Sequence, residues 1–206
     1  MNCRFCLKEK IDEFKLFETS NFVVKVGYAI VAPGHVLIVS KKHIPCFSEL
    51  PEKLYDEFFK LKKTVIENVT QNFSEPFLIE YGPFWQSVPH AHLHVIPKKS
   101  TNYEIKSVLK EMLIPSGVEF KEAEFKELKG VFKKLGTYAA FEDKGRLFVC
   151  FVKKEDALKP NLFIKYRAFF TVQKSLDGIS SWKNMSDNDK ERDKVKRELT
   201  INRLKF

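Results

Sequence analysis

The sequence has no run of about 18 apolar residues, the length that a helix needs to cross a membrane. Its first residues lack the basic region and long apolar segment of a secretory signal. We therefore expect a cytoplasmic protein with no membrane partner. In that compartment the four cysteines are not expected to form disulfide bonds.

Histidine is scarce, yet three of the five histidines stand on alternate residues: His90, His92 and His94. If this stretch is a β-strand, all three side chains lie on one face at a spacing of about 6.6–7 Å. Imidazoles that close together can share one metal ion or one phosphate group. Because each buried polar ring needs a partner, a core strand has no use for three of them. The stretch therefore predicts a functional site.

The charge of the chain is unevenly distributed. Residues 1–97 contain 11 basic and 11 acidic residues, whereas residues 98–206 contain 25 and 16, which accounts for the whole net charge of +9. This favours an acidic partner such as a nucleotide or nucleic acid, although lysine-rich surfaces also keep proteins soluble. The 44% of apolar residues, with 20 phenylalanines among them, is enough for a substantial core.

The first half of the chain predicts strands, one long helix and then two more strands. Apolar residues recur at three- or four-residue steps from Leu54 through Phe58, Leu61, Val65 and Val69, which is typical of an amphipathic helix. The expected strands are short apolar or β-branched runs: Phe22–Val26, Ala29–Val31, Val36–Ser40, Phe77–Ile79 and the histidine stretch. This order indicates an α+β fold with a mainly antiparallel sheet and a long helix.

The chain changes character near residue 100, so we expect a catalytic domain over residues 1–99 and a basic, mixed α/β C-terminal extension over residues 100–206. The extension predicts a β-hairpin of Thr137–Phe141 and Arg146–Val152. Its expected helices are Tyr103–Met112, Glu119–Lys134, Leu162–Leu176 and Asp187–Lys205, the last with Val195, Leu199 and Leu204 facing inward.

From the residues alone, three interpretations of the histidine strand stay open. The three imidazoles bind a metal ion, or one neutral imidazole attacks phosphorus while its neighbours neutralise the charge, or the cluster is structural. An ordinary histidine pKa near 6.5 makes an unprotonated nucleophile available at neutral pH. Gln86 and Ser87 add hydrogen-bond donors just upstream. Cys3 and Cys6 have the spacing of a zinc-binding pair, which alone is a weak signal.

Three separate blocks of sequence carry a resemblance to a known family: Pro33–Val39, Lys41–Ile44 and Gln86–Ile96. They closely resemble the histidine-triad (HIT) superfamily, whose signature is His-φ-His-φ-His-φ-φ with φ apolar, and His90–Ile96 meets every position. The resemblance covers about residues 3–99. It implies a HIT-like fold and a nucleotide hydrolase or nucleotidyl transferase that acts at an α-phosphate.

The resemblance also implies roles for single residues. His92 is the expected nucleophile, which forms a nucleotidyl-histidine intermediate that water releases as a nucleoside monophosphate. His94 and His35 are expected to bind phosphate, Gln86 to lie near the leaving-group oxygen and Ser87 near the phosphate. In zinc-containing branches of the family, four positions form a structural zinc site, and they correspond here to Cys3, Cys6, His43 and His90.

Two departures from the family pattern leave a second hypothesis open. Gly27 stands where an Asp or Asn often binds the ribose hydroxyls, and Gly82–Trp85 replaces a glycine-rich loop. The alternative is therefore a nucleotide- or nucleic-acid-binding module with little catalysis. Dinucleoside polyphosphates, phosphoramidates and adenylated nucleic-acid ends are all candidate substrates. A homodimer is expected by resemblance, unless the C-terminal extension covers the dimerising surface.

Overall fold

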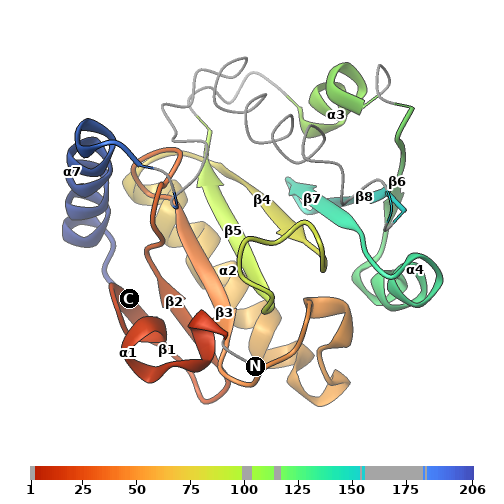
Figure 1. The fold of residues 1–206 in the computed structure, drawn as a ribbon, viewed down its shortest axis with the longest axis horizontal. Helices are drawn as coiled ribbons and strands as arrows, with labels where there is room; N and C mark the ends of the chain where they lie inside the picture. Colours follow the sequence, from red (N-terminus) through yellow and green to blue (C-terminus); the bar gives the residue numbers. More distant parts are fainter. Residues whose placement is uncertain (1–2, 99–103, 114–116, 154, 156–182, 184) are drawn as a thin grey trace.

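A computed structural model describes residues 3–98, 104–113, 117–153, 155, 183 and 185–206. Eight strands form one sheet in the order β1-β2-β3-β5-β4-β7-β8-β6, and every neighbouring pair is antiparallel (Figure 1). The expected α+β fold with a mainly antiparallel sheet is confirmed. The strands are β1 Lys15–Glu18, β2 Phe22–Lys25, β3 Val36–Ser40, β4 Pro76–Tyr81, β5 His92–Pro97, β6 Glu119–Ala123, β7 Ala139–Asp143 and β8 Arg146–Phe151.

The helices lie around this sheet. The α-helices of the described residues are α1 Lys8–Ile11, α2 Tyr55–Asn72, α3 Ile105–Leu113, α4 Leu128–Leu135 and α7 Asp187–Arg203. Short 3-10 turns occur at η1 Arg4–Cys6, η2 Phe47–Glu49, η3 Glu52–Leu54 and η5 Phe125–Glu127. Among the described helices none is long and apolar enough to cross a membrane.

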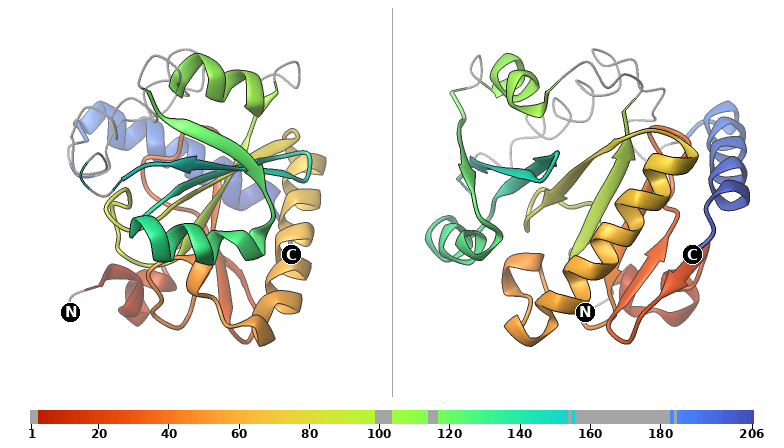
Figure 2. Two further views of the ribbon diagram at one scale, coloured as in Figure 1. Left: turned by 90° about the vertical axis from the view of Figure 1, so that its right-hand side faces the viewer. Right: turned by 180° about the vertical axis from the view of Figure 1, so that it is seen from behind.

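The long helix α2 covers one face of the sheet (Figure 2). It buries Phe58, Leu61, Val65 and Val69, as the periodicity predicts, and they share a core cluster with Leu93 and Val95 of β5. Because side chains alternate along a strand, packing of Leu93 and Val95 against α2 places His92 and His94 on the opposite face. The core contact with α2 therefore fixes which way the histidines point.

The central strand β4 is buried on both faces. Its Leu78 belongs to the α2 cluster, whereas Phe77 and Ile79 pack with Ile105 and Leu109 of α3 in a second cluster. This two-sided burial explains why Pro76–Ile79 of β4, before Glu80, is a continuous apolar run rather than an alternating one. The expected hairpin is confirmed as β7 and β8, and β7 pairs with β4, so the sheet continues past residue 100. The division of the chain at residue 99 stays a prediction.

Two sequence predictions of secondary structure are wrong. Ala29–Val31 is not a strand, because Ala29 has a φ of +53° and the backbone turns away from the sheet. Glu119–Lys134 is not one helix: it begins as edge strand β6, and a capping box between Glu124 and Glu127 then starts the helical part. Strand β1 has no strong sequence signal because its residues are mostly exposed.

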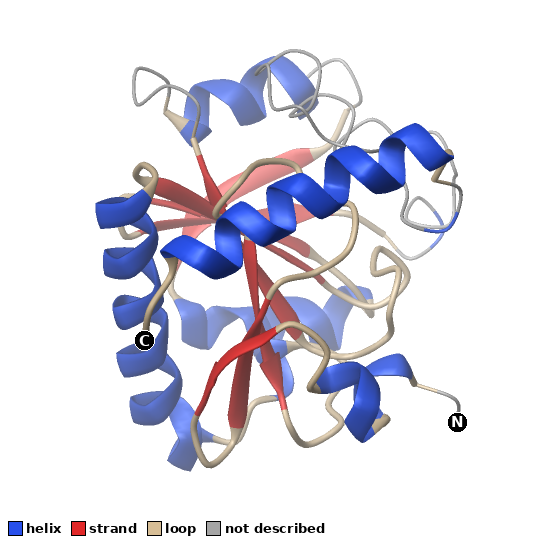
Figure 3. Cartoon of the chain, turned by 90° about the vertical axis from the view of Figure 1, so that its left-hand side faces the viewer, coloured by secondary structure: helices blue, strands red, loops and turns tan. Residues whose placement is uncertain are grey.

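The C-terminal helix α7 lies against the side of the sheet that ends in β1 and β2 (Figure 3). Leu204, just after it, is buried as expected, but Val195 is 57% exposed, so its expected inward orientation is wrong. The buried residues of α7 are Asp193, Lys196 and Thr200, a polar face. The predicted helix Leu162–Leu176 and residue Tyr103 lie outside the described residues.

Candidate functional site

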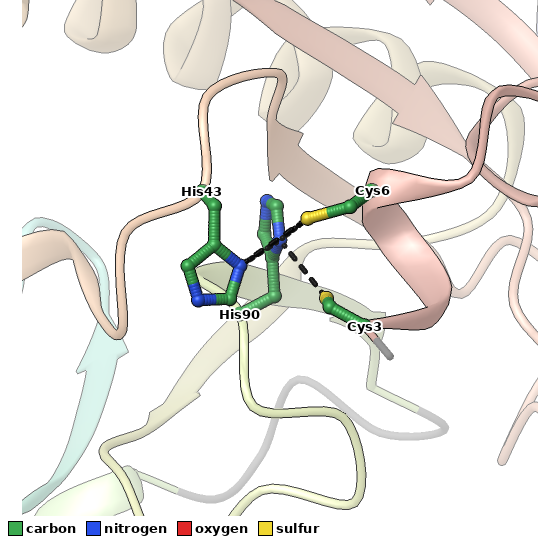
Figure 4. A group of neighbouring side chains, drawn as sticks. All are labelled: Cys3, Cys6, His43 and His90. Atoms are coloured by element: carbon green, nitrogen blue, oxygen red, sulfur yellow. Dashed lines mark hydrogen bonds between the residues drawn. The ribbon is translucent and has the colours of Figure 1, made fainter. Parts of the chain in front are cut away.

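Two cysteines and two histidines from three distant segments converge at one end of the sheet (Figure 4). Cys3 precedes η1 as its N-cap residue and Cys6 is the last residue of η1, while His43 follows β3 and His90 lies in the loop just before β5. Their ligand atoms all lie within 4.8 Å of one another. The structure thus brings together the four residues that the resemblance assigns to a metal site.

Four of the six distances between ligand atoms of the cluster, at 3.2–3.7 Å, fit a tetrahedral zinc ion. Bond lengths of about 2.3 Å to sulfur and about 2.0 Å to nitrogen place tetrahedral ligands roughly 3.3–3.7 Å apart. The Cys3 Sγ–His90 Nδ1 distance is 3.4 Å, Cys6 Sγ–His43 Nδ1 is 3.3 Å and His43 Nδ1–His90 Nδ1 is 3.2 Å. Because two thiolates and two imidazoles complete four-coordination, such a site has no open position and is structural.

The tautomer of His90 is set by a hydrogen bond from its Nε2 to the last residue of strand β3. Nε2 lies 2.6 Å from the carbonyl oxygen of Ser40, which can only accept, so Nε2 carries the proton and donates. Nδ1 is then unprotonated and faces the thiols. Metal-binding histidines typically donate their other N–H to a carbonyl in this way, which sets the tautomer that binds the ion.

His90 lies outside strand β5, so of the three expected strand histidines only His92 and His94 are in it, and they line a pocket on the face of the sheet opposite α2. The pocket lies between η1, the β2 end and β5, and it contains His35 and Ser87 as well. Its walls are formed by Arg4, Phe5, Glu13, Lys25, Val26, Gly27, Tyr28, His35, Leu37, Ser87, Val88, His92 and His94. Four of the five residues that the sequence assigns to phosphate chemistry therefore meet at one pocket.

His92 is held as a neutral imidazole with one nitrogen available. Its Nδ1–H donates to the carbonyl oxygen of His90 at 2.6 Å, so Nε2 carries the lone pair. Burial lowers the pKa of His92 to about 4, so the ring is unprotonated at neutral pH. The ring packs edge-on against Phe5 at a centroid distance of 5.5 Å. A neutral, oriented imidazole in a pocket is suited to nucleophilic attack.

A chain of hydrogen bonds assigns the proton positions on His35 and His94. The Val31 backbone N–H donates to Nδ1 of His35 at 3.2 Å, so the proton of a neutral His35 is on Nε2. Nε2–H donates to Nδ1 of His94 at 2.9 Å. His94 in its neutral form therefore carries its proton on Nε2, where it can donate to a phosphate oxygen. The rings of His92 and His94 are 5.0 Å apart.

Gln86 is the one assigned residue that does not line this pocket. Its Nε2 donates to the carbonyl oxygen of Pro45 at 2.9 Å, while its Oε1 is buried with no hydrogen-bond partner among the described residues. The side chain is thus tied to the loop that contains His43. Its expected role at a leaving group stays a prediction and needs a change in the side chain's position.

Sequence reasoning missed the polar residues at the far end of the pocket. Glu13 accepts from the hydroxyl of Tyr28 at 2.5 Å and pairs with Arg4 at 3.4 Å. Lys25 is buried, and desolvation lowers its pKa to about 8. A side chain at Gly27 would come within 3.2 Å of Leu37, so this position leaves little room for one. No motif marks these residues in the sequence, because they come from α1–β1 and β2 and meet only in the fold.

Comparison with known proteins supports the resemblance. The HIT domain family model matches residues 8–101. The chain is 31% identical over 107 residues to adenosine 5'-monophosphoramidase of Schizosaccharomyces pombe, covering 50% of this chain and 79% of that protein. This chain belongs to the HIT family.

Other HIT proteins are similar over shorter parts of their length. The chain is 35% identical over 77 residues to the asymmetrical bis(5'-nucleosyl)-tetraphosphatase of S. pombe, covering 35% of this chain and 42% of that relative. This chain thus matches less than half of the relative's length. Among solved structures, a histidine triad nucleotide-binding protein of Sulfolobus tokodaii is 24% identical, with a TM-score of 0.43. The match covers 50% of this chain and 72% of that protein. A zinc-bound histidine triad protein of Mycobacterium smegmatis is 20% identical, with a TM-score of 0.44. The match covers 50% of this chain and 78% of that protein.

Proposed function

We propose that this protein is a nucleotide hydrolase that attacks the α-phosphate of a nucleotide substrate through His92. The observation that carries the proposal is the geometry of His92: its Nδ1 donates to a backbone carbonyl, so Nε2 is the unprotonated atom of a buried, neutral ring. Membership of the HIT family adds to it, since relatives in that family are named as hydrolases of dinucleoside polyphosphates and as monophosphoramidases.

The proposed reaction has two steps at phosphorus. In the first, Nε2 of His92 forms a bond to the α-phosphorus while the bond from phosphorus to the leaving group breaks. His94 and Ser87 line the pocket and stabilise the negative charge on the phosphate oxygens, with His35 behind His94. In the second step, water attacks the nucleotidyl-histidine, releases a nucleoside monophosphate and restores His92. Transfer to another acceptor in place of water would give a nucleotidyl transferase.

The four-residue cluster would hold a structural zinc ion in this proposal. Cys3, Cys6, His43 and His90 would bind it, and the ion would fix the N-terminal segment against the start of β5. That segment supplies Phe5 and Arg4 to the pocket wall. The metal site would thus support the pocket without contacting the reacting phosphate.

The direct test compares the parent protein with His92→Ala on a panel of dinucleoside polyphosphates, nucleoside phosphoramidates and adenylated DNA ends, with products identified by mass spectrometry. The parent is expected to release nucleoside monophosphate, and His92→Ala to lose activity by on the order of 10³-fold or more while its circular dichroism spectrum is unchanged. Turnover of the same substrates by His92→Ala at the parental rate would contradict the proposed nucleophile.

The second candidate is a binding module with little catalysis, which the absence of a side chain at Gly27 favours. The same panel distinguishes the two, because a binding module would bind an adenylated compound tightly and release no nucleoside monophosphate. Nucleic-acid ends remain candidate substrates because of the basic C-terminal extension. Binding to them should weaken as salt is raised, since phosphate contacts release counterions. The cytoplasmic location stays a prediction.

A further inference from the structure

The helix α7 turns a polar face toward the rest of the protein. Asp193 and Thr200 each have 0% exposure, whereas Val195 on another face is 57% exposed. Burial of a carboxylate costs free energy unless it is hydrogen-bonded or paired. These two residues therefore contribute hydrogen bonds to the docking of α7, beside the core packing of Leu204 and the Arg197 guanidinium over Phe14.

Both residues accept hydrogen bonds from one loop, Gly27–His35. The Ile30 N–H donates to Oδ1 of Asp193 at 2.9 Å, and the Gly34 N–H donates to Oγ1 of Thr200 at 2.8 Å. The other carboxylate oxygen of Asp193 accepts from Nε of Arg197 at 2.9 Å. Two backbone groups that no strand pairs are thus satisfied by a helix that lies more than 160 positions away in the sequence.

The same loop sets the proton positions at the pocket. The N–H of Val31, the residue after Ile30, donates to His35, and His35 follows Gly34 directly. Each backbone group that α7 holds is therefore one residue away from a member of the chain Val31–His35–His94. The loop has no strand to hold it in place, and it includes two positive φ angles, +53° at Ala29 and +87° at Gly34.

We infer that Asp193 and Thr200 are positioning residues of the active site, because they hold the loop so that Val31 keeps His35, and through it His94, in the tautomer that donates to phosphate. This inference rests on the proposed function for its catalytic consequence. The contact itself, and its effect on the two histidines, do not depend on the substrate. Helix α7 would thus be needed for catalysis, because it holds the loop that positions two histidines of the pocket.

The kinetic test uses matched pairs of variants in the full-length protein. Thr200→Val removes the acceptor while nearly keeping the shape, Thr200→Ser keeps the acceptor, and Asp193→Ala and Asp193→Asn form the second pair. We expect Thr200→Val and Asp193→Ala to lower kcat by about 10–100-fold, because small displacements of catalytic groups cost that much. The KM should change little, and Thr200→Ser should recover most of the loss. Asp193→Asn should recover only part of it, because its one amide oxygen can accept from Ile30 but not from Arg197 as well. Val195→Ala, on the exposed face of the same helix, should match the parent.

A spectroscopic test separates positioning from a merely structural role. In protein with ¹⁵N-labelled histidine rings and no substrate, the parent should show Nδ1 unprotonated and Nε2 protonated on both His35 and His94. Thr200→Val should mix the tautomers of His35, and the amide protons of Ile30 and Gly34 should exchange faster. Thr200→Ala is a second variant that removes the same acceptor with a smaller side chain.

The inference is overturned if Thr200→Val and Asp193→Ala lower stability but keep the parental kcat and the parental ring-nitrogen spectrum. Such a result would leave the proposed function intact, since parent turnover would still depend on His92. Conversely, if the parent hydrolyses no nucleotide, the proposed function fails while the ring-nitrogen spectra still decide whether α7 sets the tautomers.

Discussion

At the scale of single residues, the three histidines of the triad differ because of what surrounds each ring. His90 donates through Nε2 to Ser40 and presents Nδ1 to two thiols, which suits a metal ligand. His92 has the opposite arrangement, with Nδ1 donating and Nε2 available. Nδ1 of His94 accepts a hydrogen bond from Nε2–H of His35, so the proton of a neutral His94 is on Nε2. The three histidines thus differ in environment and in expected role: metal ligand, nucleophile and donor to phosphate.

The cluster of Cys3, Cys6, His43 and His90 gives the first residue-scale prediction. Cys3→Ser and Cys6→Ser should each lower bound zinc from about one ion per chain to near zero, since each removes one of four ligands. The free energy of unfolding should fall by several kcal/mol, on the order that structural zinc sites contribute. Zinc is measured on untagged protein by mass spectrometry, and stability by urea unfolding.

The control for the zinc prediction is Cys150→Ala, a buried cysteine in β8 outside the cluster. It should retain zinc although it loses some core packing. Parental zinc content in both Cys3→Ser and Cys6→Ser would show that these residues bind no zinc.

Glu80 gives a prediction about pH. Burial raises the pKa of its carboxyl to about 7, although the Phe47 N–H at 2.6 Å and the Tyr138 hydroxyl at 2.7 Å both donate to it. Between about pH 4.5 and about pH 7 the native state therefore binds more protons than the unfolded chain, so the free energy of unfolding falls as pH rises and levels off above about 7. A shift of this size corresponds to about 3 kcal/mol.

Glu80→Gln should remove that fall, so the variant gains stability relative to the parent as pH rises from about 5 to about 8. Urea unfolding across this range measures it, with the exposed Glu119→Gln as the matched control that should follow the parental profile. Parallel profiles for the parent and Glu80→Gln would contradict the raised pKa.

At the scale of elements, the loop Gly27–His35 connects the sheet, the C-terminal helix and the pocket. Gly34 has a φ of +87°, and a Cβ there would come within 2.6 Å of Phe73 and 2.8 Å of Pro97. Gly34→Ala should therefore cost the strain of a left-handed conformation, about 1–2 kcal/mol, plus a clash of about 1–3 kcal/mol. Because His35 is the next residue, activity should fall as well.

Gly117→Ala is the control for this prediction, since Gly117 also has a positive φ, +67°, but no atom of the described residues lies within 4 Å of its added Cβ. Its free energy of unfolding should fall only by the strain of the left-handed conformation, about 1–2 kcal/mol, and its activity should match the parent. Equal losses for the two variants in urea unfolding would show that the tight packing around Gly34 is relieved at little cost.

How much of these elements the sequence predicts depends on where their partners are. Strand β3, helix α2 and the hairpin follow from local periodicity and turn signals, and the HIT resemblance names the four residues of the cluster of two cysteines and two histidines. The strand expected at Ala29–Val31 fails because an apolar run is compatible with a buried loop as well as a strand. Val195 fails because the partners of α7 are backbone N–H groups of that loop, which no pattern of apolar residues reveals. Sequence patterns do not place Glu13 and Lys25 at the pocket, because the two residues meet only through the fold.

At the scale of the whole molecule, the sheet shows where a second copy could add strands. Both edges of β4 are taken, by β5 and β7, so among the described strands only β1 and β6 have an edge available for another chain. The expected homodimer would therefore use one of these edges or a surface outside the sheet. The alternative is that the C-terminal extension covers the dimerising surface. In this chain β7 pairs with β4, so the extension occupies that edge of β4.

Light scattering coupled to size-exclusion chromatography tests the oligomeric prediction. A homodimer has twice the 24.1 kDa of one chain, and its mass should fall on dilution through the dissociation constant. A mass of one chain at all concentrations would contradict the homodimer and favour the extension as the cover of the dimerising surface.

The central claim is that His92 forms a covalent bond to the substrate's α-phosphorus, and trapping that intermediate tests it most directly. The parent protein is mixed with a substrate labelled at the α-phosphate, quenched in base within the first turnover, digested and sequenced by mass spectrometry. The account predicts a nucleotidyl group on His92, with none in His92→Ala and an unchanged peptide containing His94. Label on a different residue, or burst-free product formation with no labelled peptide, would contradict it.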